Sequence, residues 1–271
     1  MPELAEVERM RREWDPGVGS RIREVYLHPE KRIFRGIRPD DLAAALTGST
    51  LRSSESHGKQ MMFFFSATRP GRSCYLGVHL GMTGELRALS PKYPPERHDH
   101  LVLRQAKHSL VLTDPRLFGR VTFAEGSPPE FWTARPPAVL DRAFTLRRLE
   151  DYLRRHRGAP IKALLLDQAM FPGIGNWMAD EILWRAELHP RRTGLDLDEA
   201  EVRRLWKETR FVAREALLRI AERGVDPPAT WLFPHRWEDG GRCPRTGTGL
   251  VRETIGGRTT CWSPGRQPEL G

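Results

Sequence analysis

The sequence lacks any apolar run long enough to span a membrane. A membrane-crossing helix needs roughly 18 or more consecutive apolar residues, and no such run occurs in the 271 residues. The first six residues, MPELAE, are acidic and lack the apolar core of an export signal. We therefore expect a protein that does not enter a membrane and that works in the cytoplasm.

Cysteine is also scarce, with three residues in the whole chain. Three thiols cannot build the disulfide framework on which many small secreted domains depend, which points to a reducing compartment. Hydrophobic residues make up 39% of the chain, enough to form buried cores and to exclude wholesale disorder. The length suits two modest domains or one large domain.

Lysine is scarce as well: six of the 44 cationic side chains are lysine and 38 are arginine, in a chain of net charge +9. A surplus of positive charge suits a polyanionic partner, because contacts with phosphates release condensed counterions. A solvated basic surface would give the same composition, and an arginine excess can reflect genomic base composition alone. Composition therefore leaves nucleic-acid binding open.

The order of the hydrophobic patterns predicts a β-rich part followed by a helical part. A helix is expected over residues 7–14, and strands that indicate a sandwich or barrel are expected at 21–27, 61–66, 74–79, 100–104, 109–112 and 120–124. Later helices are expected over residues 146–156 (capped by Thr145), 161–168, 176–188 and 198–223. Gly256 and Gly257 predict the turn of a hairpin over residues 254–260.

These patterns define an α+β multidomain fold class. We expect an N-terminal β-sandwich with a flanking helix (residues 1–126), a proline-containing linker (127–141), a helical domain (142–224) and a C-terminal β-hairpin module (225–271).

Pro2 is the first residue with possible chemistry. Removal of Met1 would leave a secondary α-amine, and α-amino groups have pKa values of about 8, against about 10.4 for lysine, so more of the amine is neutral at pH 7. A neutral amine can attack an electrophilic carbon, and the resulting iminium promotes elimination. Glu3 and Glu6 lie nearby in sequence as proton donors or shuttles. Many proteins begin with Met-Pro for no catalytic reason, so Pro2 alone decides nothing.

Two glycine-containing turns are candidates for binding phosphate. Residues 172–176 (PGIGN) precede an expected helix, so their backbone N–H groups and the Asn176 amide can approach an anion, while the preceding helix carries Lys162. Arg258 follows the predicted hairpin turn, where a guanidinium can bind a phosphate through two hydrogen bonds. An ordinary interhelical turn and a solvated basic loop are the alternatives.

Two loops carry large apolar residues between expected strands. Met82 lies in residues 79–84 (HLGMTG), and Phe118 lies in residues 114–119 (DPRLFG). Such side chains can enter a stack of DNA bases as wedges, although core packing at a strand end is the more common explanation.

Together these segments resemble the formamidopyrimidine-DNA glycosylase and endonuclease VIII family of base-excision repair enzymes. The resemblance runs over nearly the whole chain and follows the family's order: residues 1–8 (MPELAEVE), 58–60 (GKQ), the two loops 79–84 and 114–119, and residues 161–168, 172–176 and 179–183, which are similar to its helix–two-turns–helix element.

The resemblance implies a bifunctional DNA glycosylase and abasic-site (AP) lyase that needs no cofactor and acts, as a monomer, on double-stranded DNA with damaged bases or abasic sites. Pro2 would attack C1′ of the damaged nucleoside and form a Schiff base, and Glu3 would donate the proton that opens the sugar. Lys59 would assist elimination and bind phosphate, while Arg258 would bind phosphate and assist a second elimination.

The resemblance also implies residues that contact DNA. Met82, Arg116 and Phe118 would fill the gap left by the flipped nucleotide, with Arg116 facing the orphaned base. Asn176 would bind phosphate, and His98 and Arg157 would contact DNA. His98 and His100 could instead be a metal pair, but no third ligand is evident near them, and no metal is expected.

Two departures from the family pattern bear on the finger and on the substrate. Cys243 and Cys261 each retain only the first cysteine of a Cys-x-x-Cys pair, and two thiols do not make a tetrahedral zinc site, so we expect a zincless finger. Residues 223–233 are short and proline-rich where relatives that recognise 8-oxoguanine have a longer loop, and Leu117 occupies a frequent arginine position.

The preferred lesion therefore stays open. Oxidised or ring-opened bases, oxidised pyrimidines and bulky crosslinked bases are alternatives with the same chemistry. A damaged-DNA-binding protein without catalysis is the alternative from another class, and retention of Met1 would favour it.

Overall fold

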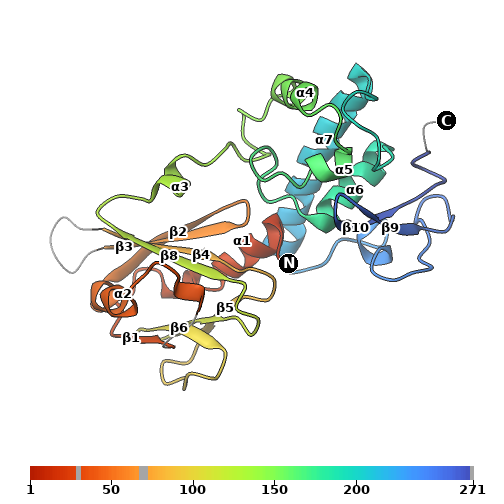
Figure 1. The fold of residues 1–271 in the computed structure, drawn as a ribbon. Helices are drawn as coiled ribbons and strands as arrows, with labels where there is room; N and C mark the ends of the chain where they lie inside the picture. The colour runs from red at the N-terminus through yellow and green to blue at the C-terminus, as the bar shows by residue number, and fades with distance from the viewer. Residues whose placement is uncertain (29–31, 67–72, 269–271) are drawn as a thin grey trace. The chain divides into compact units, whose positions relative to one another are not determined.

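The computed structural model describes residues 1–28, 32–66 and 73–268 (Figure 1). These residues form two compact units: residues 1–2 with 6–135 make unit 1, and residues 3–5 with 136–271 make unit 2. Each unit buries a hydrophobic core of its own. Among the described residues, no helix has both the length and the apolar character needed to cross a bilayer.

Unit 1 contains two four-stranded antiparallel sheets. One sheet has the order β2-β3-β4-β8 and the other β1-β6-β7-β5. In chain order the strands are β1 (Glu24–Leu27), β2 (Thr50–His57), β3 (Gln60–Ser66), β4 (Cys74–His79), β5 (Glu85–Leu89), β6 (Asp99–Arg104), β7 (Ser109–Thr113) and β8 (Arg120–Glu125). Both sheets contribute to one buried cluster, which includes Phe63 and Phe65 from β3 and Leu101 and Leu110 from the other sheet. The arrangement is the expected β-sandwich.

Short helices flank the sandwich. They are α1 (Leu4–Arg12), α2 (Pro39–Leu46), α3 (Glu130–Thr133) and the 3₁₀ turns η1 (Asp15–Gly17) and η2 (Arg32–Phe34). Leu4 and Ala5 pack in the core of unit 2, whereas Val7 packs in the core of unit 1. This division explains why the predicted start at residue 7 was wrong: the apolar positions of α1 serve two cores, so no single periodic face marks its beginning.

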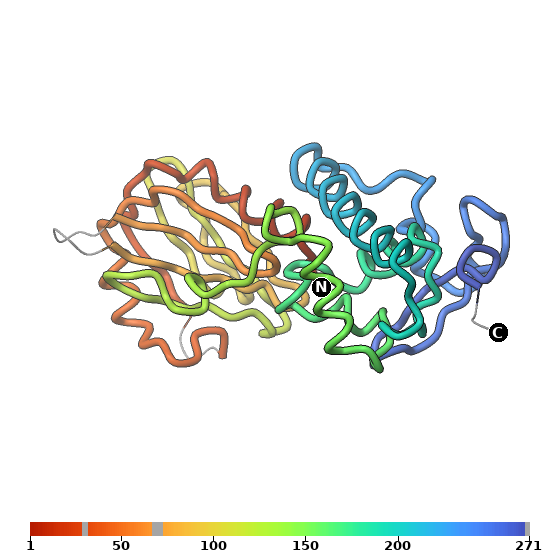
Figure 2. Tube along the Cα trace, turned by 90° about the horizontal axis from the view of Figure 1, so that it is seen from above, coloured from red at the N-terminus to blue at the C-terminus, as the bar shows by residue number. Residues whose placement is uncertain are grey.

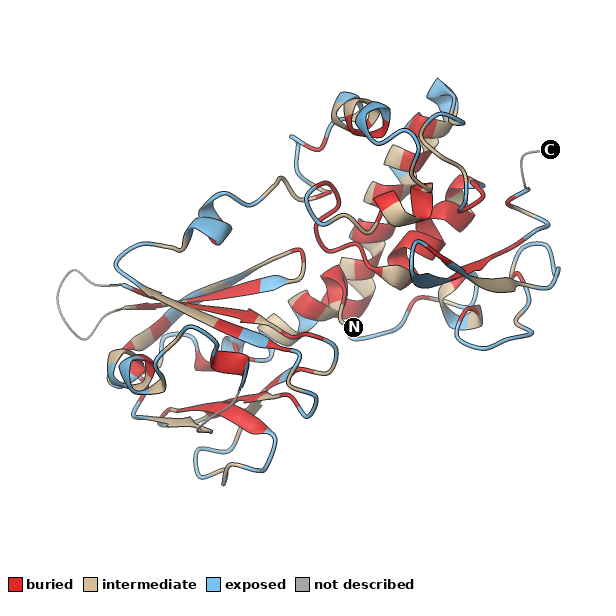
Figure 3. Ribbon diagram, in the orientation of Figure 1, coloured by how far each residue is buried: buried red, intermediate tan, exposed pale blue. Residues whose placement is uncertain are grey.

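Unit 2 consists of helices and a terminal hairpin. Its elements are α4 (Leu146–Arg155), α5 (Ile161–Leu164), α6 (Asn176–Ala186), α7 (Glu199–Ala216), the π-helical turn η3 (Leu217–Glu222), the 3₁₀ turn η4 (Phe233–His235), β9 (Val251–Ile255) and β10 (Arg258–Trp262). α7 is the long helix of this unit in Figure 2, and α6 is buried along nearly its whole length (Figure 3).

Local signals explain where these helices begin. Thr145 accepts a hydrogen bond from the backbone N–H of Arg148, as predicted for the cap of α4. Asp198 and Glu201 form a reciprocal capping box at the start of α7. The hairpin turns at Gly256 and Gly257, both with positive φ, and Arg258 follows directly.

The fold class is confirmed, but several predicted boundaries were wrong. The helix expected over residues 161–168 ends at Leu164, because the side chains of Asp167 and Gln168 bond to nearby backbone groups and compete with helical bonding. The strand expected from residue 21 begins at Glu24, since Arg21 forms only an isolated bridge with Thr50. The helix expected to reach residue 188 ends at Ala186, because Glu187 is left-handed (φ 58°).

Among the described residues, the longest elements that were missed are β2, β5 and α2; the short helix α3 and the 3₁₀ turns η1, η2 and η4 were missed as well. β2 (TLRSSESH) and β5 (ELRAL) are edge strands with polar residues on the exposed side, so their apolar pattern is weak. α2 begins with Pro39 and has Asp40 and Asp41 in its first turn, which are the usual signals of a helix start.

Candidate active site

Glu3 lies at the amino end of α6 and is almost fully buried, with 3% of its surface exposed. Its carboxylate accepts the backbone N–H groups of Gly175 (2.9 Å), Trp177 (2.9 Å) and Met178 (3.1 Å). These N–H groups have no partner within the helix, and a helix amino end favours a negative charge. The residue covalently bonded to Pro2 is therefore anchored on the helix–two-turns–helix element.

This contact corrects one expectation about residues 172–176. Their backbone N–H groups were predicted to approach a phosphate, but that of Gly175 binds the chain's own Glu3. The N–H of Gly173 donates to the side-chain oxygen of Gln168 (3.1 Å), and the N–H of Ile174 donates to the carbonyl of Phe171 (3.1 Å). Gly175 is required here, because a Cβ atom would lie 2.3 Å from the carboxyl carbon of Glu3.

Lys59 lies in a tight hairpin turn between β2 and β3. The turn consists of Gly58, which has φ of 59°, and Lys59, and it is closed by the pair His57 and Gln60. The backbone therefore presents Lys59 at the end of the sheet, where its side chain is half-buried.

His79 is the residue at this sheet end that the sequence analysis did not assign a role. Burial lowers its pKa, and the positive charges of Lys59 and Arg120 lower it further. The backbone N–H of Gly81 donates to Nδ1 of His79 (3.1 Å), which places the proton of the neutral ring on Nε2. His79 pairs with Gln60 of β3 and with Arg120 of β8, and this register brings its ring close to the two positive charges. The sequence pattern does not reveal this proximity, because it depends on how the strands pair.

The two predicted wedge loops pack against one another. Gly81 has φ of 63°, and a Cβ atom there would lie 2.4 Å from the backbone carbon of Phe118. Met82 and Phe118 are 40% and 55% exposed, so the alternative that they fill the core is wrong. The guanidinium of Arg116 lies over the ring of Phe118, 4.9 Å from its centroid.

Asp114 connects these two loops through hydrogen bonds. It is fully buried and accepts the hydroxyl of Thr83 (2.9 Å) and the backbone N–H groups of Arg116 (3.2 Å) and Gly119 (2.7 Å). One carboxylate thus fixes the loop that carries Met82 and the loop that carries Phe118.

Asn176 and the hairpin come together in unit 2. The Asn176 side-chain N–H donates to the backbone carbonyl of Thr259 (2.7 Å), next to exposed Arg258. Gly256 packs closely on Ala163, where a Cβ atom would lie 2.8 Å from the Ala163 Cβ. Contacts on α6 and α5 thereby position the hairpin tip.

The remaining two candidates, His98 and Arg157, are exposed. The His98 carbonyl accepts the backbone N–H of Asp114, and the Arg157 carbonyl accepts that of Leu195. His100 is buried, and its Nε2 lies 2.8 Å from the Asp114 carbonyl. Within residues 1–28, 32–66 and 73–268, no three His, Cys, Asp or Glu side chains are grouped as metal ligands.

Comparison with known proteins agrees with this geometry. The formamidopyrimidine-DNA glycosylase N-terminal domain matches residues 1–121, and the formamidopyrimidine-DNA glycosylase H2TH (helix–two-turns–helix) domain matches residues 136–225. The formamidopyrimidine-DNA glycosylases of Alkalilimnicola ehrlichii and Thermomicrobium roseum are 34% and 35% identical to this chain, covering 98% and 99% of it and 100% and 99% of their own lengths. This chain belongs to the formamidopyrimidine-DNA glycosylase family.

A solved structure supports the same assignment. The Lactococcus lactis formamidopyrimidine-DNA glycosylase, determined non-covalently bound to DNA containing an AP site, matches with a TM-score of 0.85 and 27% identity, over 98% of this chain and 100% of that one. Members of the formamidopyrimidine-DNA glycosylase family are base-excision repair glycosylases, and AP lyase chemistry is typical of them.

The finger of this family member has a different interior from a zinc site. Cys243 and Cys261 are buried free thiols. Burial opposes ionisation of Cys243, but hydrogen bonds from Ser263, Thr246 and Trp184 outweigh it and lower the pKa of the thiol to about 6. Two thiols with hydroxyl neighbours do not fit a tetrahedral zinc ion.

Buried charges link the finger to the helix–two-turns–helix element. Lys162 is fully buried and donates to Asp180 (2.5 Å) and to the carbonyl of Asn176 (2.8 Å). Asp180 also accepts from Arg236 (2.6 Å) and from the backbone N–H of Cys261 (3.0 Å) in β10. Lys162 therefore supports the fold and is not available to a phosphate.

Proposed function

We propose that Pro2 is the nucleophile of a bifunctional DNA glycosylase and AP lyase. The observation that carries this proposal is the anchoring of Glu3 by three backbone N–H groups at the start of α6. A flexible chain terminus would spend little time in a reactive geometry, whereas an anchored neighbour reduces the entropy lost when Pro2 meets its target.

The proposed chemistry begins when Met1 is removed, because the Pro2 nitrogen is otherwise an amide. The Pro2 nitrogen bonds to C1′ as the bond from C1′ to the base breaks, and the base leaves with the electron pair. The Glu3 carboxylate takes the N–H proton of the attached Pro2 and passes it to the ring oxygen O4′, so that the C1′–O4′ bond breaks and the sugar opens to give an iminium. Loss of a C2′ proton then expels the 3′ phosphate. A second elimination, assisted by Lys59 and Arg258, expels the 5′ phosphate. Water finally hydrolyses the iminium and releases Pro2.

The exposed loop residues suit the proposed insertion into DNA. Met82 and Phe118 expose apolar surface that a base stack would cover, and Arg116 stands over Phe118 with its guanidinium able to reach a base edge. Among the candidate phosphate ligands, Lys59, Asn176 and Arg258 are supported by their placement at turns, and we add neutral His79 beside Lys59. His98 and Arg157 are supported by exposure and by the family resemblance.

Duplex DNA with damaged bases or abasic sites is the proposed partner. The Lactococcus lactis relative has been determined with AP-site DNA, with DNA containing N7-benzyl-Fapy-dG and with DNA containing an oxidised pyrimidine. We further propose that the chain acts as a monomer on the nucleoid in the cytoplasm, and that residues 1–126, 127–141, 142–224 and 225–271 are its functional parts.

The range of lesions bound by that relative favours a second candidate substrate, oxidised pyrimidines. The first candidate substrate is a ring-opened base, the kind of lesion for which the family is named. A panel of duplexes with one lesion each separates the two candidates: cleavage at ring-opened purines above oxidised pyrimidines supports the first, and the reverse order supports the second.

The role of Pro2 is tested by blocking its nitrogen. The protein carrying an amino-terminal tag is compared with the same protein after cleavage that exposes Pro2. The tagged form should bind an AP-site duplex but fail to cleave it, and exposure of Pro2 should restore cleavage. Equal cleavage by both forms would reject Pro2 as the nucleophile.

A further inference from the structure

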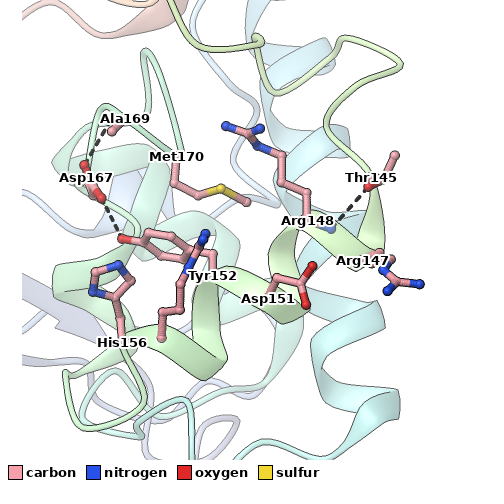
Figure 4. A pocket seen from close by; sticks show the side chains of 10 residues that line it. Thr145, Arg147, Arg148, Asp151, Tyr152, His156, Asp167, Ala169 and Met170 are labelled. Carbon is pink, nitrogen blue, oxygen red and sulfur yellow. Dashed lines mark hydrogen bonds between the residues drawn. The ribbon is translucent and has the colours of Figure 1, made fainter.

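A cavity of about 680 Å³ lies between α4 and the segment that follows α5 (Figure 4). Figure 4 shows Arg148 and Met170 extending into this space from opposite walls. The cavity, here termed the α4 cavity, is lined by Thr145, Arg147, Arg148, Asp151, Tyr152, Arg155, His156, Asp167, Ala169 and Met170. Neither the family comparison nor the proposed chemistry gives it a role.

The acidic side chains of the α4 cavity are already engaged. Asp167 accepts the hydroxyl of Tyr152 (2.8 Å) and the backbone N–H of Ala169 (3.0 Å). Asp151 pairs with Arg154 (3.1 Å) on the exposed side of α4. Because Asp151 is paired with a cation outside the cavity, Asp167 alone offsets one of the three arginine charges that line it, and the cavity keeps a net positive charge.

Three arginines line the α4 cavity without an ion-pair partner among the described residues: Arg147, Arg148 and Arg155. Arg147 and Arg155 are exposed, whereas Nε of Arg148 is buried and has no hydrogen-bond partner within the part of the chain that the structure describes. A buried guanidinium N–H without an acceptor costs free energy, so an anion entering the cavity would be stabilised by it. Guanidinium groups bind phosphate and carboxylate groups well because they can donate two parallel hydrogen bonds to either.

The spacing of these arginines favours a chain of phosphates over a single one. Arg148 and Arg155 are seven positions apart in α4, which puts them on one face of the helix with their Cα atoms about 10 Å apart along the axis. One strand of a duplex advances about 3.4 Å per nucleotide along its axis, so this distance corresponds to about three nucleotides. Arg157, a proposed DNA contact, lies two residues beyond the end of α4.

We propose that the α4 cavity binds backbone phosphates of duplex DNA away from the lesion. Arg147, Arg148 and Arg155 are the proposed ligands, and the contact is independent of base sequence because it is made to the phosphates alone. This inference rests on the proposed function only in taking DNA as the partner.

The test compares three proteins by the salt dependence of their binding to a long duplex with a stable abasic analogue. They are the wild type, Arg147→Gln/Arg155→Gln, and Arg203→Gln/Arg214→Gln. The last removes the same charge from exposed positions of α7 that have no partner among the described residues. Fluorescence anisotropy gives the slope of log K against log salt concentration.

The slope of Arg147→Gln/Arg155→Gln, the cavity variant, should be smaller in magnitude than the wild-type slope by about 2, since each of the two lost phosphate contacts contributes about 0.9. The α7 variant should keep the wild-type slope. Equal slopes in all three proteins, or an equal loss in both variants, would overturn the proposal. Cleavage of AP-site DNA by the wild type is measured alongside: its absence rejects the proposed function, whereas intact cleavage with equal slopes rejects only the α4 cavity.

The anion bound in the α4 cavity could be a DNA phosphate or free inorganic phosphate. Measuring Tm in inorganic phosphate and in chloride at equal ionic strength distinguishes these two sources. A phosphate-dependent rise in the Tm of the wild type but not of the cavity variant, combined with unchanged DNA slopes, would assign the α4 cavity to free phosphate and overturn the DNA assignment. The slope loss itself, with the α7 variant unaffected, supports the DNA backbone.

Discussion

At the residue scale, single buried groups explain most of the local geometry. Glu3 satisfies three backbone N–H groups at the start of α6, and Gly175 leaves room for it. Asp114 fixes two loops, and Asp180 connects a lysine, an arginine and a backbone N–H. None of these carboxylates is on the solvated surface, so each contact acts in a site where water does not compete.

Cys243 provides a pH-dependent prediction. Its pKa is lowered to about 6 in the folded protein from an ordinary thiol value of about 9. Between these values the unfolded chain binds more protons than the folded one, so stability should rise with pH from about 6 to about 9 and be lost as pH falls through the folded value. Urea unfolding across this range measures the slope.

Cys243→Ser should flatten this dependence because serine does not titrate. Cys261→Ser is the matched control, since the pKa of Cys261 is raised to about 12, mainly by burial, and this thiol stays protonated throughout. A pH slope that survives Cys243→Ser would show that another group is responsible.

At the element scale, the two exposed loops form one unit because their backbones touch. Gly81→Ala should disturb this contact, since its Cβ would lie 2.4 Å from the Phe118 backbone at a position with φ of 63°. We expect weaker binding of a duplex with a stable abasic analogue, by roughly tenfold or more, corresponding to about 1.4 kcal/mol.

Gly126→Ala is the control for Gly81→Ala, because it introduces the same kind of backbone strain without displacing the two exposed loops. Gly126 also has positive φ (86°), but a Cβ there would meet nothing within 4 Å. Its DNA affinity should match that of the wild type, and an equal loss in both variants would mean that the contact between the loops is unimportant.

The buried charges beneath the hairpin give a second prediction at this scale. Asp180→Asn leaves Lys162 and Arg236 without their shared carboxylate, and breaking a buried ion pair costs about 3–5 kcal/mol. Urea denaturation should show this loss. Glu187→Gln, at a half-exposed ion pair with Arg266, should cost less than about 1 kcal/mol; similar losses in both variants would contradict the buried anchor.

At the scale of the whole molecule, the sequence predicted the α+β class, the sandwich and the hairpin, because glycine turns and alternating strands are local signals. It could not reveal the capture of Glu3 by α6, which joins residues 172 positions apart in the chain. It also missed the edge strands β2 and β5, whose exposed polar residues weaken their apolar pattern. The burial of Lys162 is likewise not visible in a motif.

The same limits apply to the candidate site. The sequence alone could not show whether Met82 and Phe118 are wedges or core residues. Their exposure in the folded chain excludes the core. His79 acquires its place beside Lys59 through strand register, and the α4 cavity arises from residues 145–156 meeting 167–170. Motifs therefore predicted the chemistry more completely than the contacts that support it.

The measurement that tests the central claim most directly is peptide mapping of the protein–DNA adduct. Borohydride reduction during reaction with an AP-site duplex should trap the Schiff base, and mass spectrometry should locate the sugar remnant on the amino-terminal peptide at Pro2, with Met1 absent. A remnant on Lys59 or another amine, or no adduct with protein that cleaves the duplex, would contradict the account.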